Sequence, residues 1–152
     1  MKKTVYSKLV LTYVALTLFI GSILIPLGYQ MTKDYYQEIT QKLNTNIAMY
    51  MASNYNLADN PSMLTNIATQ AMILNPAIEI YLLDTAGKII QHTQNPESIK
   101  RYLVDTAPIK TFLSADSHFP IRGTDPKSRS ASKVFSVAPL NNSNNRLSGY
   151  VY

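Results

Sequence analysis

The chain has 152 residues, the length of one ordinary domain, and carries 14 basic and 9 acidic side chains but no cysteine. Lys2, Lys3 and Lys8 form a basic tip at residues 1–8, ahead of a long uncharged segment. The remainder is close to neutral, so the excess charge does not indicate a face that binds nucleic acid. The absence of cysteine excludes disulfides, thiolate zinc sites and a cysteine nucleophile, and two histidines do not indicate a histidine-rich metal site.

Residues 9–29 contain no charged side chain. A helix of this length spans about 31 Å, which matches the hydrocarbon core of a bilayer, so the segment predicts a transmembrane helix in contact with membrane lipid. A cleaved signal peptide has a shorter apolar region and a small-x-small cleavage site, which residues 26–30 do not supply. The lysines of the tip outweigh Lys33 beyond the segment, which predicts a cytoplasmic N-terminus and places residues 30–152 outside the cytoplasm.

The outward part is predicted to begin with a helix that continues from the membrane segment. Apolar residues recur in steps of three and four from Met31 to Tyr55, and no glycine or proline interrupts this stretch. Such a stripe can be buried on the chain's own domain or on a second copy of the chain, and both remain open. The residues expected at a homodimer interface are Ile39, Leu43 and Ile47.

The pattern then predicts a loop, a second helix and a sheet. Residues 56–60 are predicted to form the loop, and Pro61 to start a helix that stops near Asn75 and Pro76. Gly87 is expected to adopt a positive φ in a hairpin turn, with Asp84 as a turn-stabilising residue. Short runs rich in β-branched and aromatic residues predict strands at residues 77–84, 88–93, 133–140 and 147–152. The connections are expected to be a short helical piece at 95–103, a turn or helix at 107–113 and a long polar loop at 114–132.

These elements predict an α+β fold: one transmembrane helix continuing into a long helix that packs on an antiparallel sheet. The order resembles the front end of bacterial membrane-bound sensor histidine kinases, in which a transmembrane helix and a long periplasmic helix precede a PAS-like domain of the Cache type. The segments that carry the resemblance are Ile80–Thr93, Pro120–Leu140 and Ser148–Tyr152. The resemblance implies that the last strand leads to a second transmembrane helix and to kinase domains, so the chain is expected to be a truncated piece of such a protein.

No catalytic residue is predicted in the chain. A Walker loop, a G-x-S-x-G elbow, an H-E-x-x-H helix and a glycine-rich dinucleotide turn are all missing from the sequence. His92 and His118 are interpreted as solvated or edge-strand side chains. No metal site and no cofactor is therefore predicted, and any catalytic activity would belong to the parent protein, which the resemblance implies is a histidine kinase.

A basic group near the predicted loop suggests a ligand site. His118, Arg122, Lys127, Arg129 and Lys133 fall within a short stretch that contains two acids, Asp116 and Asp125. In Cache-type folds this region lies beside the ligand pocket, and cations placed there could clamp a carboxylate or phosphate. A solvated basic loop is the alternative. The predicted ligand-binding residues, for a small anionic ligand, are His118, Arg122, Arg129, Lys133 and Tyr81. The aromatic residues Tyr81, Phe119, Phe135 and Tyr150 are expected to be sheet core in preference to a ligand cage.

Three functions are considered for the chain. The leading hypothesis is an extracytoplasmic signal-sensing module of a two-component histidine kinase in the bacterial inner membrane, which would reach a response regulator only through domains absent from this chain. The alternatives are a membrane-anchored periplasmic interaction or assembly protein, and the sensor front end of a chemoreceptor or cyclic-dinucleotide enzyme.

Overall fold

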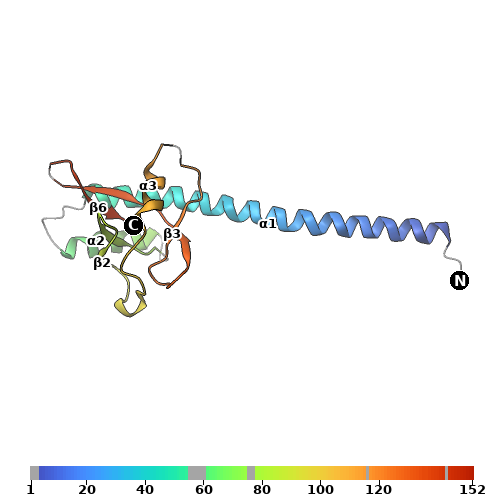
Figure 1. Ribbon diagram of the computed structural model, residues 1–152, viewed down its shortest axis with the longest axis horizontal. Helices are drawn as coiled ribbons and strands as arrows, with labels where there is room; N and C mark the ends of the chain where they lie inside the picture. Colours follow the sequence, from blue (N-terminus) through green and yellow to red (C-terminus); the bar gives the residue numbers. More distant parts are fainter. Residues whose placement is uncertain (1–3, 55–60, 75–77, 116, 143) are drawn as a thin grey trace. The chain divides into compact units, whose positions relative to one another are not determined.

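The computed structural model describes residues 4–54, 61–74, 78–115, 117–142 and 144–152, which form an α+β structure with an antiparallel sheet (Figure 1). The chain divides into two units, residues 1–37 and residues 38–152. The helices are α1 (Val5–Asn54), α2 (Pro61–Leu74), the 3-10 turn η1 (Pro96–Ser98) and α3 (Thr106–Leu113). The strands are β1 (Tyr81–Asp84), β2 (Ile89–His92), β3 (Arg122–Thr124), β4 (Ser132–Val134), β5 (Ala138–Asn141) and β6 (Leu147–Val151).

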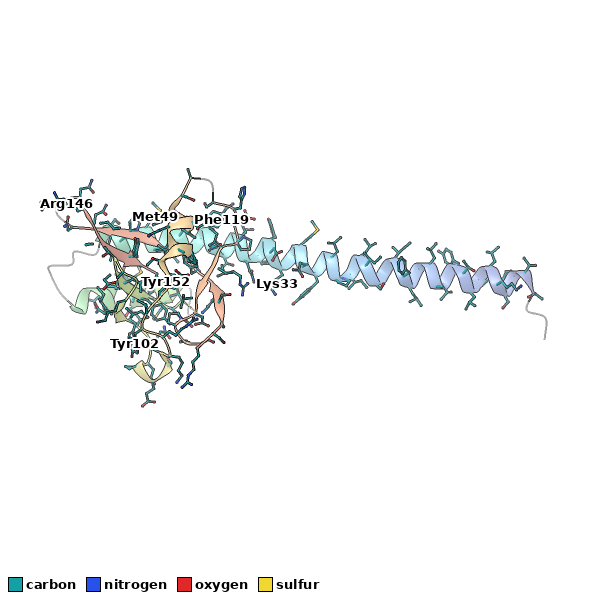
Figure 2. The ribbon with its side chains drawn as sticks, in the orientation of Figure 1. Lys33, Met49, Tyr102, Phe119, Arg146 and Tyr152 are labelled. Carbon is teal, nitrogen blue, oxygen red and sulfur yellow. The ribbon has the colours of Figure 1, made fainter. Side chains whose placement is uncertain are left out.

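The first unit contains α1 as far as Gln37, and the apolar side chains of this part are exposed on all sides of the helix (Figure 2). α1 is long and apolar enough to cross a membrane, with a mean hydropathy of 2.2 over its most apolar window. Two threonine hydroxyls of this segment bond to the helix backbone: Thr12 donates to the carbonyl of Lys8 at 2.9 Å, and Thr17 donates to that of Tyr13 at 2.9 Å.

The four-stranded sheet of the second unit has the order β2-β1-β6-β5, with all neighbours antiparallel. β1 and β6 are central, and their register pairs Leu82 with Val151 and Leu83 with Tyr150. Side chains alternate between the two faces of a strand, and both faces of β1 are buried. The sheet therefore separates two apolar clusters.

The first cluster, called the aliphatic face, lies between the sheet and the two long helices. Four of its nine buried members are alanines, three of them on the helices, which allows helices and sheet to approach closely. Figure 1 shows α2 near the strands, in agreement with this packing. Its buried members are Ala48 and Met51 of α1, Ala68 and Ala71 of α2, and Ile80, Leu82, Ala138, Leu140 and Val151 of the sheet region.

The second cluster, called the aromatic face, lies on the opposite side of the sheet. The rings of Phe135 and Tyr152 stack with centroids 4.8 Å apart, and Phe112 of α3 packs against Phe135 at 5.4 Å. A Cβ on Gly123 would lie 2.8 Å from both the Phe135 ring and the Tyr152 hydroxyl, so β3 needs a glycine to pass these rings. Other buried members are Tyr81, Leu83, Ile89, Ile99, Val104, Ile109, Ile121, Val137 and Tyr150.

The β1–β2 hairpin confirms the predicted turn. Gly87 has a φ of 89°, and a Cβ there would lie 2.2 Å from the Val104 carbonyl oxygen. The Asp84 carboxylate accepts hydrogen bonds from the backbone N–H groups of Ala86 and Lys88 at 2.9 and 2.8 Å. Of the two possibilities predicted for residues 107–113, a turn or a helix, the structure shows the helix α3, which Asp105 caps by accepting from the N–H of Ala107 at 2.9 Å.

The prediction of one continuous strand at residues 133–140 is wrong. The segment divides into β4 and β5, which belong to different sheets, and residues 135–137 between them are not a strand. The physical reason is Gln41 of α1. Its side-chain amide donates to the backbone carbonyl of Phe135, and its backbone carbonyl accepts from the Ser136 hydroxyl. These groups are therefore bonded to a helix instead of a neighbouring strand.

Two connections also differ from expectation. The predicted loop at 114–132 contains β3, which pairs with β4 in a separate two-stranded sheet. The helical piece predicted for residues 95–103 is limited to η1, because Leu103 forms a β-bridge to Lys88 and the Ile89 N–H bonds to the carbonyl of Tyr102. Several predicted features lie outside the described residues: Lys2 and Lys3 of the tip, Tyr55, the loop at 56–60, the helix stop at Asn75 and Pro76, the first residue of the 77–84 strand, and Asp116.

Candidate functional site

The β3–β4 hairpin, defined as residues 122–134, is held in shape by its own backbone and by Arg101. The Asp125 N–H donates to the carbonyl of Ala131 at 3.3 Å, and the Asp125 carboxylate accepts from the N–H of Lys127 at 2.9 Å. Arg101 donates through Nη2 to the carbonyls of Asp125 and Ala131. The N–H groups of Lys100 and Arg101 both bond to the Pro126 carbonyl, at 2.8 and 3.0 Å. The hairpin is therefore an ordered element that can act as one body.

Glu79, just before β1, binds this hairpin through charge. Its Oε1 lies 2.9 Å from the Lys127 Nζ, and its Oε2 lies 3.2 Å from the Lys133 Nζ. The Tyr81 hydroxyl donates to Oε2 at 3.2 Å. The Glu79 side chain is only 18% exposed, so these bonds are shielded from solvent on the carboxylate side. The Glu79 carboxylate thus connects the segment just before β1 with two residues of the hairpin, Lys127 and Lys133.

The charge state of this cluster follows from its surroundings. Burial raises the pKa of the Glu79 carboxyl, but hydrogen bonds from Lys127 and Lys133 outweigh burial and hold the pKa below its ordinary value of 4.5. Burial, followed by the neighbouring Glu79 charge, raises the pKa of the Tyr81 hydroxyl above its usual range. At neutral pH the cluster therefore contains an ionised carboxylate and a neutral tyrosine that donates to it.

Gln41 of α1 binds the base of the hairpin. Its Oε1 accepts from the N–H of Ile121 at 2.9 Å, and its Nε2 donates to the carbonyl of Ile121 at 2.8 Å and to the carbonyl of Phe135. Its backbone carbonyl accepts from the Ser136 hydroxyl at 2.7 Å. Gln41 is only 1% exposed. Because the residues it binds flank β3 and β4, this amide connects the helix directly to both strands.

Tyr152 supplies a third attachment to the hairpin. Its hydroxyl donates to the carbonyl of Thr124 at 2.7 Å, and its backbone N–H and C=O pair with those of Tyr81 at 2.8 Å. Burial raises the pKa of the Tyr152 hydroxyl, which keeps the group neutral as a donor. Figure 2 shows this residue within the body of the domain. The hairpin is therefore attached at three places: to Glu79 before β1, to Gln41 of α1, and to Tyr152 after β6.

Two of the predicted ligand residues meet at Glu79. Tyr81 is 2% exposed, so its ring belongs to the core and only its hydroxyl reaches the carboxylate. Lys133 lies on the surface with its ammonium on Glu79. The remaining predicted residues are exposed: Arg122, which donates to the Ser132 carbonyl at 3.2 Å, and His118 and Arg129. Among the residues that the structure describes, no group of three or more His, Cys, Asp or Glu side chains could hold a metal ion.

The predicted dimer residues do not all share one environment. Ile39 and Leu43 are 37% and 61% exposed, whereas Ile47 is half-buried and packs against the aliphatic face. The buried residues of α1 are Gln41, Ala48 and Met51, and Ile47 and Ala52 pack beside them as partly buried residues. The helix thus has one side on its own domain and an apolar strip beside it at the surface.

Sequence reasoning missed both Gln41 and Glu79. Nothing in the pattern separates Gln41 from the other amides of α1, because its partners are backbone groups 80 and more residues away. Glu79 did leave a signal: it is the one acid in the run from Ala77 to Leu83, and a charge beside buried strand residues requires a partner.

Comparison with protein-family models, with curated proteins and with solved structures finds no match to this chain.

Proposed function

We propose that this chain is a membrane-anchored signal-sensing module of a two-component histidine kinase, with a PAS-like domain of the Cache type at residues 30–152. The observation that carries the proposal is the role of α1. One helix contains the apolar segment and also the residues Gln41, Ala48 and Met51 that dock on the domain. A change in the hairpin or the sheet can therefore bias the position of the same helix that enters the membrane.

The proposed location is the bacterial inner membrane, with a single span in this chain and the domain outside the cytoplasm. The three basic residues before the apolar segment, against Lys33 after it, support this orientation. The exposed apolar ring of side chains on residues 5–29 supports contact with membrane lipid.

The proposed ligand is a small anion at the cationic surface of the β3–β4 hairpin. Arg122, Arg129 and Lys133 present cationic groups there, with His118 shortly before β3. Guanidinium and ammonium groups bind carboxylates and phosphates by charge-assisted hydrogen bonds. Binding in this region would act next to Lys127 and Lys133, the two residues that Glu79 holds.

The proposed signalling unit is a homodimer that associates along α1. Ile39 and Leu43 supply an exposed apolar strip, and Ile47 lies at the edge of the domain's own core. A ligand that shifts the equilibrium between two dimer packings would need a preference of about 1–3 kcal/mol for one of them. The response regulator would be reached only through kinase domains that are absent from this chain.

The experiment is a chimera in which residues 1–152 are joined, through a second membrane helix, to a histidine kinase core. Gln41→Ala should change the autophosphorylation rate by about 5- to 150-fold, the range of ordinary allosteric coupling, because it removes the contact between hairpin and helix. Asn46→Ala, an exposed amide on the same helix, is the matched control and should leave the rate unchanged. Equal rates for the wild-type and Gln41→Ala chimeras would contradict the proposed signalling route.

A second candidate is a membrane-anchored interaction or assembly protein. The observation in its favour is a shallow depression on α1, lined by Met31, Thr32, Tyr35 and Tyr36, whose apolar side chains are exposed. Such a patch suits contact with another envelope protein. An autophosphorylation rate that is the same in the wild-type and Gln41→Ala chimeras would favour this candidate. A sensor front end for a chemoreceptor or a cyclic-dinucleotide enzyme would use α1 in the same way, and the output domain decides between these.

A further inference from the structure

We propose that Glu79 is an acid-labile latch: its protonation releases Lys127 and Lys133 and frees the β3–β4 hairpin to move against Gln41 of α1. The latch stands on the geometry of the hairpin alone, and only its use in signalling rests on the proposed function. The two lysines approach from different parts of the hairpin, Lys127 from the loop and Lys133 from β4.

The first step is the loss of charge on one carboxylate. The charged and titratable groups that face Glu79 are Lys127, Lys133 and the Tyr81 hydroxyl. Behind Tyr81, the Asp125 charge acts on the hydroxyls of both Tyr81 and Tyr152, and Arg101 acts on Tyr152. A protonated Glu79 has no charge to hold two ammonium groups. The Lys127 and Lys133 side chains are 34% and 52% exposed, so their ammonium groups can turn to water.

The second step carries the release to the helix. Lys133 pairs with Gly123 across the hairpin, and the next pair, Arg122 with Val134, ends the two-stranded sheet. The residues directly beyond that pair are Ile121 and Phe135, and both bond to the Gln41 side chain. Glu79 and Gln41 therefore bind the same short pair of strands two residues apart. The bonds from Arg101 and Tyr152 to the loop end of the hairpin remain when Glu79 is protonated, so the movement is limited to the strand ends beside Gln41.

The pH range follows from the sign of the coupling. Both lysines favour the ionised form of Glu79, so the pKa of its carboxyl in the folded chain lies below the ordinary 4.5. The latch is closed at neutral and weakly acidic pH and opens as the pH falls below 4.5. It is a response to strong acid.

The test is hydrogen exchange of the full chain in detergent micelles, with rates divided by those of an unstructured chain at the same pH. At pH 7, Glu79→Gln should lower the protection of peptides covering residues 121–134 by about tenfold, since a hydrogen-bonded ion pair is lost. Wild-type protein should lose the same protection as the pH is lowered below 4.5. Glu97→Gln, an exposed carboxylate of the same domain, is the matched control and should behave as wild type throughout.

Peptides from β1 and β6 report whether the sheet is still folded. A second variant, Lys127→Gln with Lys133→Gln, removes the partners and keeps the carboxylate. It should also lower the protection of the hairpin at pH 7, and lowering the pH should then cause no further loss of protection. The latch is overturned if Glu79→Gln keeps wild-type protection, if Glu97→Gln loses as much, or if both charge variants unfold the sheet along with the hairpin. A working latch with no effect of Gln41→Ala on the kinase chimera would reject the signalling route alone.

Discussion

The two faces of the central sheet are built by different means. The aliphatic face joins β1, β5 and β6 to α1 and α2 through alanines, branched aliphatic side chains and one methionine, and its buried cluster contains no aromatic residue among the described residues. The aromatic face is filled by large rings and is bordered by polar attachments at Glu79, Gln41 and Tyr152. Apolar packing is non-directional, whereas hydrogen bonds and ion pairs can be broken one at a time. The first face suits a fixed joint, and the second suits a hairpin that can be released.

The largest losses in the free energy of unfolding are expected from truncating one core side chain on each face. Leu82 and Leu83 are adjacent, both are fully buried, and they point to the aliphatic and aromatic faces respectively. Each change to Ala should lower the free energy of unfolding by about 2–5 kcal/mol. Chemical denaturation of the full chain in micelles measures the loss, and Leu103→Ala, at a 64% exposed site, should cost far less.

The location of the damage distinguishes the two variants. In hydrogen exchange, Leu82→Ala should mainly expose the docked part of α1 and the described part of α2, and Leu83→Ala should mainly expose α3 and the β3–β4 hairpin. Identical exchange patterns would show that the faces are one cooperative unit and would remove the contrast between them.

An intermediate effect is expected from enlarging the aliphatic face. Ala138 in β5 is 1% exposed and lies in the cluster with the helices. Ala138→Leu should lower the free energy of unfolding by about 1–3 kcal/mol, because a close-packed joint has no room for added methylenes. Ala107→Leu, on the exposed side of α3, provides the same substitution without crowding. A neutral Ala138→Leu, measured by the same denaturation, would mean that this face is loosely packed.

The smallest effect is expected from one polar attachment of the aromatic face. Tyr152→Phe keeps the stacked ring on Phe135 and removes only the hydrogen bond to the Thr124 carbonyl. The free energy of unfolding should fall by about 0.5–1.5 kcal/mol, and thermal unfolding should confirm the direction. Tyr102→Phe, at a 49% exposed ring, is the control. A loss as large as that of Leu83→Ala would show that the hairpin is fixed as firmly as the core.

The sequence predicts what depends on local pattern. The helices, the Gly87 turn with Asp84, and the strands at β1, β2 and β6 follow from periodicity and turn chemistry. The break at residues 135–137 does not, since it comes from Gln41, which lies far away in the sequence. β3 was missed because three residues, one of them Gly123, carry too little pattern.

The candidate site was predicted only in part. Lys133 and Tyr81 were named, and both meet at Glu79, but Glu79 itself was not named. The cationic residues of the stretch were grouped by their closeness in the sequence. In the structure, Lys127 and Lys133 differ from the other cations of this stretch because they form ion pairs with Glu79. Which cations meet this acid depends on the tertiary structure.

The place of β6 in the sheet governs the order of assembly. β1 and β2 are neighbours in the sequence and can pair as soon as both have been synthesised, whereas the pairing of β1 with β6 must wait for the β5–β6 hairpin at the other end of the domain. Until residues 147–151 have emerged, β1 has an open edge and both Leu82 and Leu83 lack part of their cover. Biogenesis of this domain therefore includes an interval in which one edge of an apolar strand is unprotected, a state that favours aggregation.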